Sequence, residues 1–122
     1  MNSATAAAQR YSSLSEHTRN AKDLEYDVIL GVTRDLSSCM SAEKTDFPTL
    51  VKTLHKNERL WTAIGTQVAD SSNQLDASLR ARLFYMAQFV TQHTSKVLSG
   101  EAGVESLIEI NVAVLRGLKG TV

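Results

Sequence analysis

The sequence has few residues that form tight turns, a single cysteine, and no long apolar run. One proline and six glycines in 122 residues are too few for the many turns of an all-β fold. The single cysteine, Cys39, cannot close an internal disulfide, which indicates a reducing compartment, and we expect a cytoplasmic protein. The longest apolar runs fall far below the ~20 residues that a spanning helix needs, so we expect no insertion into a membrane.

The sequence also has no excess of charge of either sign. Thirteen Lys and Arg residues balance thirteen Asp and Glu residues, which gives a formal net charge of zero. A neutral chain has no global field that would attract a phosphate backbone, so we expect no direct contact with nucleic acid. Hydrophobic residues make up 43% of the chain, enough for a core, and 122 residues fit one domain.

The apolar residues recur three and four positions apart over long segments, which is the spacing of amphipathic helices. We therefore predict an all-α fold, a single-domain helical bundle of four or five helices over residues 1–122. Asp46 and Pro48 are typical of a helix start, and Gly100 of a helix end. The alanine-rich N-terminus predicts a further helix within residues 1–19, docked loosely on the bundle. The main helices are expected at about 20–40, 47–70, 75–99 and 104–119.

The sequence shows no constellation of catalytic or metal-binding residues. His17, His55 and His93 lie on three different predicted helices, and none has a second His or Cys three or four positions away. No glycine-rich phosphate loop and no nucleophile elbow occurs, and no nucleophile lies at a fixed spacing from a base. We therefore predict that the protein is not an enzyme and has no catalytic residues, metal site or cofactor.

Three polar or aromatic residues lie within apolar patterns and call for an explanation. For Trp61, the only tryptophan, we favour a place in the core over a role as a binding anchor. For His93 we favour a half-buried imidazole, hydrogen-bonded to a neighbouring helix, over a functional role. Asn111 has apolar neighbours on its helix, so its amide must find hydrogen-bond partners, either for specificity or to join two helices.

The last predicted helix is apolar over well over half of its circumference. A surface helix of a monomer usually needs less apolar surface than this. We expect one side of this helix to bind a partner, and the alternative is burial in a homodimer.

Three short motifs, in this order, resemble the FlaF family of flagellar regulators from alphaproteobacteria. The resemblance extends over about residues 24–118. Glu58 and Asp76 depart from it, because a basic residue and a proline are expected at these positions. The motifs are Asn57-Glu58-Arg59-Leu60-Trp61-Thr62, Phe89-Val90-x-x-His93-Thr94 and Leu107-Ile108-x-Ile110-Asn111-x-x-Val114-x-x-Gly117-Leu118.

The resemblance implies a cytoplasmic protein that binds flagellin as a secretion chaperone and acts with the translational regulator FlbT. The alternative is a post-transcriptional regulator that acts chiefly through FlbT or flagellin mRNA. Because the terminal segments of flagellin form amphipathic helices, we expect an apolar groove formed by the last two predicted helices. The residues expected to contact the partner, or to fix its register, are Trp61, Phe84, Phe89, His93, Ile110, Asn111, Val114 and Leu118.

Overall fold

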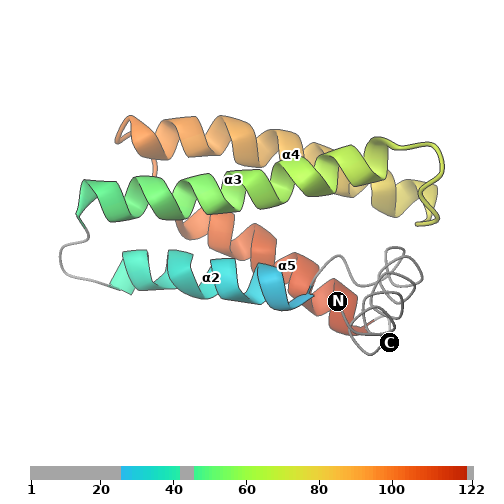
Figure 1. Cartoon of the computed structure of the whole chain (residues 1–122), viewed down its shortest axis with the longest axis horizontal. Coiled ribbons are helices and arrows are strands. Elements are labelled where there is room, and N and C mark those ends of the chain that lie inside the picture. The colour runs from blue at the N-terminus through green and yellow to red at the C-terminus, as the bar shows by residue number, and fades with distance from the viewer. Residues whose placement is uncertain (1–25, 42–45, 121–122) are drawn as a thin grey trace, which may run out of the picture.

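The computed structural model describes residues 26–41 and 46–120, and this part of the chain forms four helices and no strand (Figure 1). The prediction of an all-α bundle is confirmed. The further helix expected within residues 1–19 lies outside the described residues. The helices are α2 (Tyr26–Ser41), α3 (Phe47–Ala69), α4 (Ala77–Leu98) and α5 (Glu105–Gly120).

The helices form two packed pairs, α3 with α4 and α2 with α5, that share one core. The α3 and α4 helices pack on each other over most of their length, and α2 packs against both α3 and α5. In Figure 1, α5 passes behind α3 from the short turn after α4 and continues towards the end of α2 where that helix begins. No described helix is both long enough and apolar enough to cross a membrane. The fully buried apolar side chains are Ile29, Leu36, Leu54, Trp61, Val90 and Leu107.

The α3 helix begins at the predicted residue, with Asp46 as its N-cap. The Asp46 carboxylate accepts hydrogen bonds from the Thr49 hydroxyl at 2.8 Å and the Thr49 backbone N–H at 3.1 Å. These two bonds, the hydroxyl first, hold the pKa of Asp46 below its usual value of 3.8. The cap therefore stabilises the fold above that value, and its contribution is lost as the pH falls through the lowered pKa.

The turn between α3 and α4 is held by an arginine of α4. Arg80 donates from Nε to the Val68 carbonyl at 2.9 Å and from Nη2 to the Asp70 carbonyl at 2.8 Å. These carbonyls belong to the C-terminal end of α3, where a cation is also favoured by the helix dipole. The α4 helix begins after its N-cap Asp76, so the predicted start at residue 75 is two residues early.

The α4 helix ends at Leu98, with Ser99 as its C-cap, and the next residue, Gly100, has a φ of +80°. The Gly100 N–H donates to the Val97 carbonyl at 3.1 Å, and the Glu101 N–H donates to the Lys96 carbonyl at 2.8 Å. This pair of bonds is the Schellman arrangement, in which the left-handed residue is usually glycine. Gly100 is therefore the helix-end signal that the sequence predicts, and the helix itself ends at Leu98, one residue before the expected 99.

Substitution Gly100→Ala is expected to lower the free energy of unfolding by about 1 kcal/mol, because a Cβ disfavours the left-handed conformation. The measurement is denaturation by urea, with Gly117→Ala as the control. Gly117 lies within α5 and a Cβ there meets nothing within 4 Å, so this control should keep or raise the stability. Equal effects of the two substitutions would contradict the assignment of Gly100 as a helix cap.

Candidate functional site

Three buried side chains form a hydrogen-bonded chain through the core. The Trp61 indole Nε1–H donates to Asn111 Oδ1 at 2.8 Å, and Asn111 Nδ2 donates to Asn57 Oδ1 at 2.9 Å. Asn57 and Asn111 are 0% exposed and Trp61 is 1% exposed. Asn57 and Trp61 belong to α3 and Asn111 to α5, two described helices whose backbones do not pack directly on each other. The chain of hydrogen bonds therefore joins α3 to α5 across the centre of the bundle.

The indole fixes the direction of this hydrogen-bonded chain. A tryptophan can only donate, so the Asn111 oxygen must face Trp61 and the Asn111 NH₂ group must face Asn57. The Asn57 oxygen accepts from Asn111, which leaves the Asn57 NH₂ group at the end. In the described part of the chain, Asn57 Nδ2 is the one fully buried side-chain nitrogen or oxygen with no hydrogen-bond partner. An unpartnered buried amide costs about 1–3 kcal/mol. The three hydrogen-bonded side chains therefore serve to specify which helices pair, rather than to raise the stability of the fold.

These observations confirm two predictions from the sequence. Trp61 is a core residue, and the Asn111 amide has found partners on another helix. Both hydrogen-bond partners of Asn111 lie on α3, at least 50 positions away in the sequence.

A groove of about 420 Å³ lies between α3 and α4. The Phe84 ring, 39% exposed, forms part of its wall on α4, and the buried Trp61 lines it from α3. The two helices approach closely here because Gly65 faces Ala87. The lining residues are Trp61, Thr62, Gly65, Thr66 and Ala69 of α3 and Phe84, Ala87, Gln88 and Thr91 of α4.

Substitution Gly65→Ala is expected to cost about 1 kcal/mol of stability, because its Cβ would lie 3.2 Å from the Ala87 Cβ and push the helices apart. Gly31→Ala is the matched control, since Gly31 is also helical and a Cβ there meets nothing within 4 Å. The control is expected to raise stability by roughly 0.5–1 kcal/mol through helix propensity. Thermal denaturation measures both changes, and a gain from Gly65→Ala would contradict the close approach of α3 and α4.

Exposed aromatic side chains continue along α4. Phe84 and Tyr85 make an edge-to-face contact with ring centroids 6.2 Å apart, and Tyr85 is 68% exposed. One turn further on, Phe89 is 41% exposed and stacks on the His93 ring, with the two ring centroids 5.2 Å apart. Exposed aromatic rings of this kind are frequent in protein interfaces, where they act as anchors.

The surroundings of His93 agree in part with the prediction from the sequence. The imidazole is half-buried, and its Nε2 lies 3.0 Å from the Gly103 carbonyl oxygen. The partner belongs to the turn between α4 and α5, whereas the prediction was a neighbouring helix. The ring therefore ties α4 to this turn while its face packs on Phe89.

The other predicted binding residues lie on α5, on the core side of the helix. Asn111 and Val114 are buried, and Ile110 and Leu118 are half-buried against the core. The structure brings Trp61 and Phe84 together in one groove, and it is α3 that completes this groove with α4. The prediction placed the groove between the last two helices, α4 and α5, and Trp61 is the one α3 residue that it named. Gly65 and Ala69, small residues four positions apart, are the signal that could have indicated a close approach of helices there.

The described residues offer little for a metal ion. No three His, Cys, Asp or Glu side chains gather closely enough to hold one within residues 26–41 and 46–120.

The Asp70 carboxylate accepts hydrogen bonds from the backbone and the side chain of Ser72. These bonds, with a smaller effect of Arg80, lower the pKa of Asp70.

A comparison with protein families identifies the chain. The family model described as flagellar protein FlaF matches residues 7–118. No curated protein and no solved structure gives a significant match. Because the match extends over most of the sequence, the chain belongs to the FlaF family of flagellar proteins, which implies a role in the biosynthesis of the flagellum.

Proposed function

We propose that this protein is a secretion chaperone that binds flagellin before export, with an amphipathic helix of flagellin lying in the α3/α4 groove. The groove itself is the observation that carries this proposal. It is open to solvent along two packed helices, small residues form its base, and Phe84 forms part of one wall. An amphipathic helix binds by laying its apolar face into an open groove with apolar surface, which these features provide.

The dimensions of the groove support a short helical contact. Its walls extend from Trp61 to Ala69 on α3 and from Phe84 to Thr91 on α4. At 1.5 Å per residue these walls are roughly 10–12 Å long, which is about two turns of a helix. A flagellin helix would therefore place apolar side chains at positions i, i+3 or i+4, and i+7 in the groove.

The predicted binding residues have two kinds of role in this proposal. Phe84 and Phe89 present exposed rings for direct contact with flagellin. Trp61 and Asn111 support the groove from inside the bundle, where their hydrogen bond joins α3 to α5, and Val114 supports it as a buried side chain of the core. Ile110 and Leu118 also act indirectly, as half-buried side chains packed on the core, and His93 ties α4 to the turn before α5.

A chaperone that hands its client to an export machinery must also release it. We therefore expect an affinity in about the micromolar range, near 8 kcal/mol, which a few aromatic anchors of roughly 2 kcal/mol each can supply. We propose that binding takes place in the cytoplasm and that FlbT is a second partner in the control of flagellin synthesis.

The test is a calorimetric titration of the purified chain with monomeric flagellin, FlbT and flagellin mRNA in separate experiments. The chaperone proposal expects a 1:1 complex with flagellin at about micromolar affinity. Peptides from the two terminal segments of flagellin then locate the bound helix. Binding of FlbT or mRNA without any binding of flagellin would overturn the proposal and favour a purely regulatory function.

A further inference from the structure

A second groove, of about 460 Å³, lies on the other side of α3, between α3 and α2. Its base is apolar, with Ile64 and Val32 buried in the core and Leu60 half-buried. Val28 lines it from α2 and is 48% exposed. The two grooves share no lining residue, because the α3 residues that line one groove alternate along the sequence with those that line the other.

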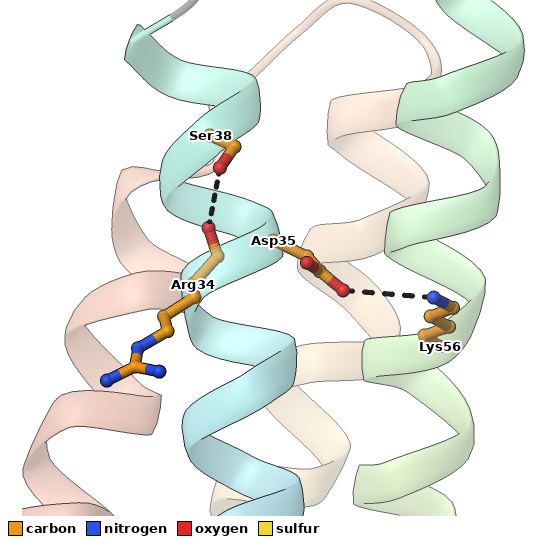
Figure 2. A network of polar contacts seen from close by, with 4 residues as sticks. All are labelled: Arg34, Asp35, Ser38 and Lys56. Carbon is orange, nitrogen blue, oxygen red and sulfur yellow. Dashed lines mark hydrogen bonds and ion pairs between the residues drawn. The ribbon is translucent and has the colours of Figure 1, made fainter.

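The edge of this second groove carries positive charge. Lys56 and Arg59 both line it, and none of the acidic residues that the structure describes does. Lys56 makes an ion pair with Asp35 of α2 at 3.8 Å, which bridges the two helices (Figure 2). Both side chains of this pair are about half exposed, so solvent screens their attraction. Arg59 has no ion pair among the residues that the structure describes.

The shape and the charge together indicate the occupant. From Lys56 to Gln67 the α3 wall is roughly 16 Å long at 1.5 Å per residue, which is about three turns of a helix. The apolar base requires apolar side chains along one stripe of the partner. Two cations are too few to hold a phosphate backbone, but they can pair with carboxylates on a protein.

We propose that the α2/α3 groove binds an amphipathic helix of a second protein whose apolar stripe has Asp or Glu residues along one edge. The stripe packs on Val28, Val32 and Leu60. The carboxylates face Arg59 and compete with Asp35 for Lys56. Because the two grooves lie on opposite sides of α3, this partner and an occupant of the α3/α4 groove bind to the same molecule at the same time.

The probes are two synthetic 18-residue helical peptides with one shared leucine stripe, flanked by Glu in the first and by Lys in the second. Affinity is measured by fluorescence anisotropy, and the site by shifts of the Val28 and Ile64 methyl signals. We expect the Glu peptide to bind the wild-type chain at least tenfold more tightly than the Lys peptide, with shifts at both residues. The double variant K56E/R59E should reverse this preference, whereas Arg82→Glu on α4 should leave it unchanged.

Equal affinities of the two peptides, or an unchanged preference in K56E/R59E, would overturn the proposal. Shifts confined to the α3/α4 groove would also overturn it, because they would place both peptides on the other side of α3. A chain that is dimeric in light scattering, and monomeric when Val28→Asp is introduced, would show that a second copy occupies the groove instead. Circular dichroism on each variant confirms that the bundle remains folded.

Discussion

Substitution Asn111→Leu is expected to lower the free energy of unfolding by about 3 kcal/mol. The change removes the acceptor of the Trp61 indole N–H and the donor to Asn57 at the same time. Both partners are fully buried, so water cannot replace the lost bonds. Each buried polar group left without a partner costs about 1–3 kcal/mol, and two are created here. Urea denaturation followed by Trp61 fluorescence measures the effect directly.

The matched control is Asn57→Leu, which makes the same change of side chain in the same chain of hydrogen bonds. This substitution leaves Asn111 Nδ2 without an acceptor, but it also removes the amide that already has no partner. The two effects oppose each other, so the stability should stay within about 1 kcal/mol of the wild type. Equal losses in the two variants, or a larger loss in Asn57→Leu, would contradict the hydrogen-bond direction that the indole imposes.

Substitution Phe84→Glu is expected to weaken flagellin binding about 30-fold. It removes an aromatic anchor from the wall of the α3/α4 groove and places a charge where an apolar stripe should pack. A loss of about 2 kcal/mol corresponds to this change in affinity. Because Phe84 is partly exposed, the variant should remain folded, which circular dichroism verifies. Calorimetric titration with monomeric flagellin gives the affinity.

The control for this prediction is Gln92→Glu, on the same helix. Gln92 is exposed and does not line the groove, and its substitution adds the same negative charge. The affinity for flagellin should stay within a factor of two or three of the wild type. If both variants bind as the wild type does, Phe84 is not a contact and the groove is not the site. If both lose affinity equally, net charge rather than the groove explains the effect.

Much of the fold can be predicted from local sequence signals. Asp46 with Pro48, and Gly100 after a long apolar pattern, are capping signals that depend only on near neighbours in the chain. The α4 helix shows the limit of these signals. Leu75 continues the apolar spacing, but the helix begins after Asp76, because the residues before it form the turn that Arg80 ties to α3.

The arrangement of the helices could not be predicted in the same way. Apolar spacing shows that one face of a helix is buried, but not which helix covers it. The apolar width of α5 suggested a free binding surface, whereas Leu107, Val114 and Leu115 are buried in the core of the single chain. The α3/α4 groove depends on Gly65 facing Ala87, a contact between residues 22 positions apart. Trp61 and Asn111 could each be singled out, but not as partners of each other.

The most direct test of the central claim is a nuclear magnetic resonance titration of the isotope-labelled chain with monomeric flagellin. If flagellin lies in the α3/α4 groove, the backbone amide signals of Thr62, Gly65, Ala87 and Thr91 should shift or broaden at substoichiometric flagellin. The amides of α2 should change little. Changes confined to α2 and α5, with the four groove signals unaltered, would contradict the account.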